Sequence, residues 1–352
     1  MSRRARERCR ERLERLALAE LGPEEARRTA IEELRRAIGF DRWCWPLTDP
    51  DSGLSTNGIG DVNFWPSLAR MVALEEHGDI TSKPSLVTGR QASAALSAVT
   101  RGNLARSRRW RECLQPYGIG DELMTVCRDR HGCWGSVELM RDSGDAPFNE
   151  DEIRLLHDLA PTLGTLVRRS LPQTWQTVPA VDRSDTPGTL ILDDDLRPAG
   201  RTKPFGDWIA ELPSADLYER LQILPTAVYE IGARLLAPPE AHSGLPNRVR
   251  IRTATGRWAV LEGAVLEGGA GGRVVITVRA ATSEEVFDLL GRVHELTQRE
   301  RQLVPLMLNG LATRELAEAL HISPYTVQDH LKAVFFKTGV RSRRELISRL
   351  AF

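Results

Sequence analysis

The chain has 352 residues, more than one ordinary hydrophobic core can organise, so we expect two or three domains. Its 41% hydrophobic and 27% charged residues are typical of a soluble globular protein, without an apolar stretch that spans a bilayer or a secretory signal. Lysine plus arginine and aspartate plus glutamate both total 48, so overall charge does not indicate nucleic acid as a partner. We therefore expect a cytoplasmic protein that does not bind a membrane.

Two helices are predicted at the N-terminus. Residues 1–22 form a charged helical pattern in which Cys9 and Leu13 recur on one side. Glutamates are interspersed among its arginines, which favours a solvated or dimer-packing helix over a basic arm on DNA. A second helical pattern covers residues 24–38 and stops at Gly39, as a glycine at this position commonly ends a helix.

A basic run follows, formed by Arg106, Arg108, Arg109 and Arg111. Such a run can contact phosphates, or it can cover the solvated face of a helix. Because neither an aromatic stacking platform nor a helix-turn-helix accompanies it, we favour the solvated face.

Two strands joined by a turn are predicted at residues 122–128 and 133–140. Cys127, His131 and Cys133 lie beside this turn and could be imagined as metal ligands. The five cysteines of the chain contain no CxxC pair, however, and we interpret these residues as flanking a turn. Neither a metal nor a cofactor is expected.

A long helix is predicted next, because Asn149 and Glu152 form a capping signature and leucines recur on one stripe as far as Leu171. Residues 172–187 are polar and contain three prolines, which predicts a linker.

A second module begins with an apolar strand at residues 189–192, which Asp193, Asp194 and Asp195 follow. These carboxylates predict a turn rather than a phosphorylated receiver or a magnesium site, because the parallel βαβ pattern of such a domain is missing.

Three further strands, near residues 249–253, 258–266 and 274–278, predict an antiparallel meander. The glycine-rich residues 268–272 are interpreted as a hairpin loop and not as a phosphate loop, since no Gly-Lys-Ser/Thr follows.

Four short helices are predicted after Glu295. Thr297 and Glu300 form a capping box for the first of them, and Ser323 with Pro324 starts the third. Residues 297–352 carry nine basic and five acidic side chains, a local positive excess in a balanced chain.

The third helix has an apolar stripe at Val327, Leu331, Val334 and Phe335. Gln328, Asp329 and Lys332 lie opposite or beside this stripe. In the major groove, glutamine can pair with adenine, aspartate can accept from cytosine, and lysine can reach guanine or phosphate. Phe336 also points outward and could pack on another domain or on thymine methyls. The alternative interpretation of this pattern is a helical bundle whose outer face is solvated.

Six motifs stand out in the last sixty or so residues: Leu-Thr-Gln-Arg-Glu-Arg at 296–301, Gly310, Glu-Leu-Ala at 315–317, Ile-Ser at 322–323, Thr-Val-Gln-Asp-His-Leu at 326–331 and Lys-Thr-Gly-Val at 337–340. Together they closely resemble the LuxR-type helix-turn-helix. The resemblance implies that the third helix enters the major groove of double-stranded DNA and that the fourth mediates a dimer contact there.

Carried over position by position, the resemblance implies three sets of contacts. Base contacts are implied for Gln328, Asp329 and Lys332. Phosphate contacts are implied for Thr313, Arg314, Tyr325, Thr326 and Lys337, and contacts between two subunits on DNA for Leu346, Ile347 and Leu350. Gln328 departs from the family, in which many members have lysine, so the base preference of other members does not transfer.

The remaining chain is similar to actinobacterial LuxR regulators with an N-terminal GAF-like domain. The motifs are Ile-Gly-Phe-Asp-Arg-Trp-Cys-Trp-Pro at 38–46, Ser-Arg-Arg-Trp-Arg-Glu at 107–112, Gly-Asp-Glu-Leu at 120–123 and Trp-Gly at 134–135. The later meander more loosely resembles a PAS-like sensor fold. Trp43, Trp45, Trp110 and Trp134 are candidates for lining a ligand pocket, although we favour core packing for most of them.

The expected fold class is an α+β sensor region, with a GAF-like and then a PAS-like antiparallel sheet, plus an all-α four-helix LuxR-type domain. The expected boundaries are 1–22 for the N-terminal helix, 23–171 for the GAF-like domain, 172–187 for the linker, 188–282 for the PAS-like domain and 283–352 for the DNA-binding domain.

The expected function is that of a homodimeric, sequence-specific transcriptional regulator, with RNA polymerase as a further partner. Its sensor half would respond to a small molecule or a partner through residues 150–171, acting as a rigid connector. The alternatives are a protein-interaction scaffold and a nucleotide-handling enzyme on a GAF-like fold. We do not expect an enzyme, because the sequence offers no nucleophile–base pair, metal-ligand spacing or phosphate loop.

Overall fold

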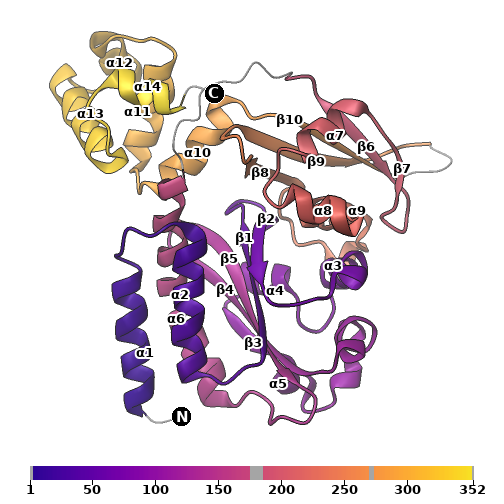
Figure 1. Ribbon diagram of the computed structural model, residues 1–352. Coiled ribbons are helices and arrows are strands. Elements are labelled where there is room, and N and C mark those ends of the chain that lie inside the picture. Colours follow the sequence, from indigo (N-terminus) through magenta and orange to yellow (C-terminus); the bar gives the residue numbers. More distant parts are fainter. Residues whose placement is uncertain (1–2, 175–184, 269–272, 351–352) are drawn as a thin grey trace.

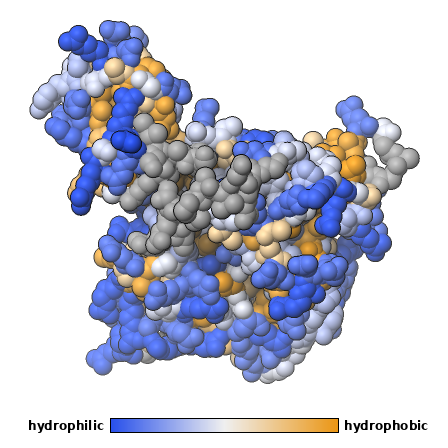
Figure 2. Space-filling model, turned by 45° about the horizontal axis from the view of Figure 1, so that its top comes forward, coloured by the Kyte–Doolittle hydropathy of each residue, from blue (hydrophilic) through white to orange (hydrophobic). Residues whose placement is uncertain are grey.

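The computed structural model describes residues 3–174, 185–268 and 273–350, which form two sheet domains and a C-terminal helical bundle (Figure 1). Most of the predicted linker and of the glycine-rich loop lies outside these residues. Within the described ranges, no helix has the length and apolar character needed to cross a membrane. Figure 2 shows hydrophilic residues over most of the visible surface, with hydrophobic residues gathered in smaller areas between them.

The first sheet belongs to the N-terminal domain, and its antiparallel strands have the order β2-β1-β5-β4-β3. The strand pair predicted at residues 122–128 and 133–140 is confirmed as β4 and β5. Both strands run further than predicted because pairing continues to Asp129 and Gly132, where the glycine adopts a φ of 148° that a side chain would disfavour. The strands are β1 (Arg42–Thr48), β2 (Ser55–Gly60), β3 (Ser93–Ala95), β4 (Ile119–Asp129) and β5 (Gly132–Asp142).

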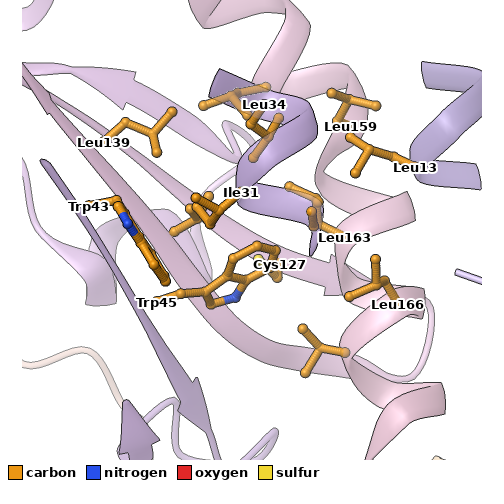
Figure 3. Close-up of a cluster of buried hydrophobic side chains, with 14 of the residues drawn as sticks. Leu13, Ile31, Leu34, Trp43, Trp45, Cys127, Leu139, Leu159, Leu163 and Leu166 are labelled. Carbon is orange, nitrogen blue, oxygen red and sulfur yellow. The ribbon is translucent and has the colours of Figure 1, made fainter. Parts of the chain in front are cut away.

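One face of this sheet is covered by α2 (Pro23–Ala37) and α6 (Glu150–Ser170), and α1 (Arg3–Leu16) packs on both helices. Figure 3 shows the core between them, in which Ile31 of α2 and Leu163 of α6 lie near the tryptophans of β1. Burial of each such aliphatic side chain contributes roughly 1.5–3 kcal/mol. The apolar side of α1, with Cys9 and Leu13, joins this core, and its charged side is exposed to solvent.

The tryptophans proposed as pocket-lining residues serve mainly as core. Trp43 and Trp45, labelled in Figure 3, are buried in this core, as is Trp134. Trp110 is half-buried and donates its ring N–H to the carbonyl of Ile119, 3.0 Å away. Trp134 also lines a cavity, with residues of the second sheet domain and of α10 (Ser283–Val293). Core packing is therefore the better account of the set.

The long helix α6 begins as predicted. The Asn149 side chain accepts from the amide of Glu152 at 3.1 Å, and the Glu152 carboxylate accepts from the amide of Asn149 at 3.0 Å. Since α6 lies along β4 for its length, it is part of the N-terminal core and not a free connector. Its last turn reaches the C-terminal bundle through Arg168.

The opposite face of the sheet carries α3 (Leu68–Glu76), α4 (Lys83–Thr88) and α5 (Leu96–Thr100). The basic run predicted to be solvated lies here, and for Arg109 that prediction is wrong. Its guanidinium is fully buried and pairs with Glu122 of β4 and, at 3.4 Å, with Glu75 of α3. The remaining short helical turns are η1 (Trp65–Ser67), η2 (Leu104–Arg106), η3 (Trp110–Leu114), η4 (Gln115–Tyr117), η5 (Leu171–Thr174) and η6 (Pro239–Ala241).

The middle domain contains the second antiparallel sheet, with the order β7-β6-β10-β9-β8. Numbered from its own first strand, this is the same order as in the first sheet. The predicted aspartate turn is confirmed, because Asp193 accepts from the amides of Asp195 and Arg197 at 2.9 and 2.8 Å. The elements are β6 (Gly188–Leu192), β7 (Pro198–Arg201), β8 (Arg248–Arg252), β9 (Trp258–Val265), β10 (Val274–Ala280), α7 (Lys203–Ile209), α8 (Ala215–Leu221) and α9 (Thr226–Leu236).

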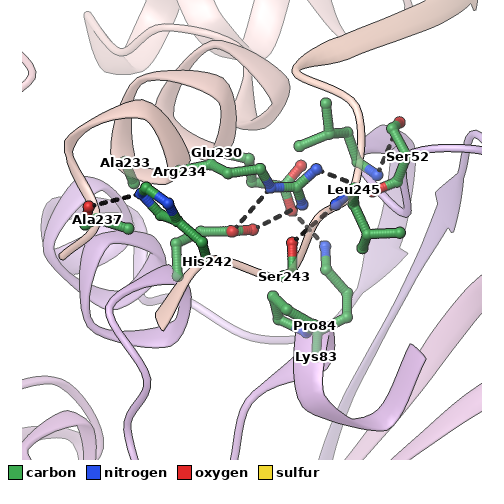
Figure 4. A network of polar contacts seen from close by, with 12 residues as sticks. Ser52, Lys83, Pro84, Glu230, Ala233, Arg234, Ala237, His242, Ser243 and Leu245 are labelled. Atoms are coloured by element: carbon green, nitrogen blue, oxygen red, sulfur yellow. Dashed lines mark hydrogen bonds and ion pairs between the residues drawn. The ribbon is translucent and has the colours of Figure 1, made fainter. Parts of the chain in front are cut away.

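The two sheet domains are joined by buried polar contacts between α9 and the N-terminal domain (Figure 4). Glu230 accepts from the hydroxyl of Ser55 at 2.8 Å and pairs with Lys83. One turn later, Arg234 donates two hydrogen bonds to Glu76, at 2.9 and 3.0 Å. These paired charges are costly to separate in a low-dielectric interior, so the two sheets are held in a fixed relation.

A glycine in the middle of α6 gives a test of the packing between helix and sheet. A Cβ on Gly164 would lie 2.6 Å from the carbonyl carbon of Arg128 and 2.8 Å from the amide nitrogen of Asp129, so backbone would have to move. Gly→Ala inside a helix usually stabilises by about 0.5–1 kcal/mol. Here we expect Gly164→Ala to lower the free energy of unfolding by about 1–3 kcal/mol in urea denaturation.

The matched control is Gly206→Ala in α7, where an added Cβ meets nothing within 4 Å. That change should raise stability by roughly 0.5–1 kcal/mol. If both substitutions stabilised the protein equally, the close approach of α6 to β4 would be refuted.

Candidate nucleic-acid interface

The four helices predicted after Glu295 are confirmed as α11 (Gln298–Leu308), α12 (Thr313–Leu320), α13 (Pro324–Thr338) and α14 (Arg343–Leu350), and α10 (Ser283–Val293) precedes them. The expected capping box starts α11, since Thr297 accepts from the Glu300 amide at 3.3 Å and Glu300 accepts from the Thr297 amide at 2.7 Å. Leu316 and Ala317 of α12 pack with Val327 and Val334 of α13 in the core of the bundle.

The turn between α12 and α13 sets the angle of the two helices. His321 adopts a left-handed φ of 52° that ends α12, and the Ile322 amide donates back to the carbonyl of Ala317 at 3.0 Å. The Ser323 hydroxyl then accepts from the amide of Thr326 at 3.0 Å and starts α13. Two helices joined by a short capped turn are the arrangement of a helix-turn-helix.

The outer face of α13 is polar and open. Gln328, Asp329 and Lys332 are exposed on it, and Tyr325 is 75% exposed at the start of the helix. Phe336, one turn beyond Lys332, is 88% exposed, so in the described part of the chain it does not pack on another domain.

Weak contacts orient the polar groups on this face. The Gln328 amide donates to the hydroxyl of Thr313 on α12 at 3.2 Å, and Lys332 lies 3.4 Å from Asp329 one turn earlier. Exposed contacts of this kind contribute little to stability and exchange readily for a ligand. The side chains are therefore pre-positioned without being committed to the fold.

The residues expected to contact phosphates differ in their exposure to solvent. Arg314 and Tyr325 are exposed, whereas Thr313 and Thr326 are half-buried beside the turn. Lys337 is drawn into the bundle, where its ammonium donates to the Glu300 carboxylate at 2.7 Å and to the Glu295 carbonyl at 3.2 Å. Burial raises the pKa of Glu300, but bonds from Lys337 and the Thr297 amide outweigh this and hold the pKa below its usual range. A phosphate contact by Lys337 thus competes with an internal ion pair.

Of the three residues expected at a dimer contact, the structure describes the side chain of one. Leu346 is 3% exposed and belongs to the core of its own bundle, which corrects the expectation that it faces a second subunit. The side chains of Ile347 and Leu350 lie outside those that the structure describes.

A buried clasp, not predicted from the sequence, holds the bundle on the N-terminal domain. Arg168, in the last turn of α6, lies 2.6 Å from Asp129 and 2.9 Å from Glu295, and it donates to the carbonyl of Val293 at 3.1 Å. Arg130 adds a second contact to Glu295 at 2.7 Å. Burial raises the pKa of Glu295, but Arg168 and Arg130 together outweigh this and keep the pKa below its usual range. Since these residues are far apart in sequence, no local pattern could have indicated the clasp.

The cysteines beside the β4–β5 turn do not converge with His131. Cys127 lies in the core under α2 and α6, whereas Cys133 lies in a separate cluster. Burial raises the pKa of both thiols, which opposes the thiolate form that binds metals. Across the described ranges, no three potential metal-ligating side chains gather at one point.

The geometry of the bundle agrees with a sequence comparison. Residues 294–350 match the family described as bacterial regulatory proteins, luxR family. The C-terminal bundle is a LuxR-family helix-turn-helix domain.

Several transcriptional regulators are similar to this chain over a short stretch. The Mycobacterium bovis protein Mb0914c is 43% identical over 56 residues, which are 16% of this chain and 6% of that protein. The monoamine regulon transcriptional regulator of Klebsiella aerogenes is 43% identical over 54 residues, 15% of this chain and 24% of that regulator. The transcriptional regulatory protein UhpA of Escherichia coli is 40% identical over 60 residues, 17% of this chain and 31% of UhpA. The match thus spans less than a third of each of these relatives.

A solved structure, that of Escherichia coli SdiA, aligns with 93% of this chain and 89% of its own, with a TM-score of 0.33 and 12% sequence identity.

Proposed function

We propose that this protein is a DNA-binding transcriptional regulator that reads its operator with α13. The observation that carries the proposal is the open polar face of α13, with Gln328, Asp329 and Lys332 exposed within a LuxR-family domain. Amide, carboxylate and ammonium groups on a short helix match the donors and acceptors at base edges in the major groove. Because its target would be chromosomal DNA, we propose that the protein acts in the cytoplasm.

We assign direct base contacts to these three side chains, and phosphate contacts to Arg314, Tyr325, Thr313 and Thr326. Lys337 would join them by leaving Glu300. Phe336 is assigned an apolar contact to thymine methyls at the end of the groove-facing surface.

A single short helix reads few bases, so a homodimer on a two-fold operator supplies the specificity that a regulator needs. Such a dimer would present its promoter-bound surface to RNA polymerase. The two sheet domains would act as a sensor, with a GAF-like N-terminal domain and a PAS-like middle domain. Their shared strand order supports a common architecture.

The test is selection of bound sequences from a random double-stranded library by the full-length protein, followed by affinity measurements at fixed salt. Gln328→Ala and Lys332→Ala should each lose about 1–3 kcal/mol of discrimination at particular operator positions. Gln91→Ala and Lys203→Ala, exposed residues of the same types outside the bundle, should leave the preference unchanged.

Uniform, weak and salt-sensitive binding to all sequences would contradict the proposal and favour an interaction scaffold. Unchanged operator preference in both α13 variants would remove the assigned base contacts.

A further inference from the structure

A cavity lies where the three domains meet, and we call it the junction cavity. Its volume is about 340 Å³, within the size range of small-molecule sites. Side chains from the start of α2, from β8 and its turn, and from α10 line it, so each domain contributes to its wall. Figure 1 shows these elements converging between the two sheets and below the C-terminal bundle.

One wall of the junction cavity holds a buried cation without a counter-ion. Arg27 is 1% exposed, and its guanidinium donates to the carbonyls of Pro23 at 3.0 Å and of Trp45 at 2.5 Å. In the described part of the chain, no carboxylate lies within ion-pair distance of it. Burial lowers the pKa of Arg27 to about 10, the direction expected when a charge is desolvated without full compensation.

The other buried arginines show that this arrangement is exceptional among the described residues. Arg109 pairs with Glu122, Arg168 with Asp129, Arg234 with Glu76, and Arg250 with Asp49. A charge taken out of water normally requires such a partner, because its desolvation is otherwise uncompensated. Each of these four guanidiniums contacts a carboxylate, whereas the Arg27 guanidinium borders the junction cavity.

The acidic side chains at the cavity wall are already engaged. Asp49 accepts two hydrogen bonds from the Arg250 guanidinium, at 2.7 and 2.8 Å. Glu24 is exposed and pairs with Arg28 at 2.9 Å. The cavity therefore offers a positive group to an entering molecule, and its negative groups are neutralised.

The rest of the lining is largely apolar. Trp134 and Leu47 come from the first sheet, and Leu289 comes from α10. Two further arginines line the cavity: Arg250 is paired with Asp49, and Arg252 donates to the carbonyl of Gly256 at 3.2 Å. Aromatic and aliphatic surfaces beside the Arg27 guanidinium suit a molecule with an apolar body and a single anionic head. Arginine binds both carboxylate and phosphate groups through paired N–H donors.

We propose that the junction cavity binds a small amphipathic organic anion, with its carboxylate or phosphate at Arg27 and its apolar body against Trp134, Leu47 and Leu289. The site deepens the sensor role within the proposed function and rests on it for its biological meaning. Leu289 belongs to α10, the helix that leads into the DNA-binding domain. A molecule bound in the cavity would therefore contact both the sheet domains and this helix.

The test measures binding to the full-length protein without DNA, so its failure and a failure of DNA binding are separate results. The probes are 3-phenylpropionate, phenyl phosphate, inorganic phosphate and the neutral 3-phenylpropanamide. Binding of each probe is measured by titration calorimetry and by the shift that it causes in the Tm of the protein. A carboxylate or phosphate ester should bind with a Kd of about 1 mM or tighter. The amide should bind at least tenfold more weakly, because it lacks the charge that Arg27 requires.

Variants locate the site. Arg27→Met, which keeps the length of the side chain and removes the charge, should weaken binding of the preferred anion at least tenfold. Arg36→Met changes an exposed arginine on the same helix that pairs with Glu33 and does not line the junction cavity, so it should leave binding unaltered. Preference for the phosphate probe over the carboxylate would identify the head group of the natural ligand class.

Equal binding of the acid and the amide, equal binding by wild type and Arg27→Met, or binding of none of the organic anions would each overturn the proposal. If Arg27→Met failed to fold, the comparison of acid with amide on the wild-type protein would still decide.

Discussion

Arg109→Met is expected to lower the free energy of unfolding by about 3–5 kcal/mol, the usual cost of breaking a buried ion pair by removing one partner. The Arg109 guanidinium is fully buried between the sheet and α3 and donates to both oxygens of Glu122. Glu75 and Glu138 lie in the same cluster. Without Arg109, Glu122 would keep a buried carboxylate that has lost its cation, beside two further acidic side chains.

Equilibrium urea denaturation of full-length protein at pH 7 would measure this loss. Glu75→Gln is the matched control in the same cluster. Burial raises the pKa of Glu75 to about 8, although Arg109 opposes the shift, so the side chain is largely neutral at pH 7 and glutamine should mimic it. A small loss for Arg109→Met, no larger than for the control, would contradict the role given to this ion pair.

The raised pKa of Glu75 also sets the sign of a pH effect. A carboxyl whose pKa is higher in the folded state stabilises the fold fully below its ordinary value of 4.5, and this contribution fades as pH rises through 8. The wild-type protein should therefore lose stability relative to Glu75→Gln between these values.

Arg168→Met should release the DNA-binding domain from the N-terminal domain. Breaking this buried pair is expected to cost about 3–5 kcal/mol, because Asp129 keeps a buried carboxylate and Glu295 and the Val293 carbonyl lose a donor. Hydrogen exchange should show the loss locally, as faster exchange in the amides around residues 293–296. Among the described residues, Gln328, Asp329 and Lys332 of α13 make no hydrogen bond or ion pair with the clasp, and only Lys337 touches it, at the Glu295 carbonyl, so base recognition should persist.

The control for the clasp is Arg169→Met, an exposed neighbour in the same turn of α6. It should leave the exchange rates near residue 293 unchanged. If Arg168→Met left them unchanged as well, the bundle would not depend on the clasp.

The helices of the DNA-binding domain were predictable because their signals are short-range. Thr297 with Glu300 and Ser323 with Pro324 cap their helices within one turn, and the stripe from Val327 to Val334 follows from helical periodicity. The exposed placement of Gln328, Asp329 and Lys332 follows from the same periodicity. Sequence patterns also indicated the paired strands β4 and β5 and the capped start of α6, since hairpins and caps depend on neighbouring residues.

The sequence by itself thus determined the capped helices of the DNA-binding domain, the exposed polar face of α13, the strand pair β4–β5 and the meander β8–β9–β10. Only the tertiary structure decided the burial of Arg109, the Arg168 clasp, the internal pairing of Lys337 and the placement of Leu346 in its own core. The physical reason is range. A cap or an amphipathic stripe acts over a few residues, whereas the partner of a buried charge is chosen by packing between segments such as Arg168 and Glu295, which no local pattern connects.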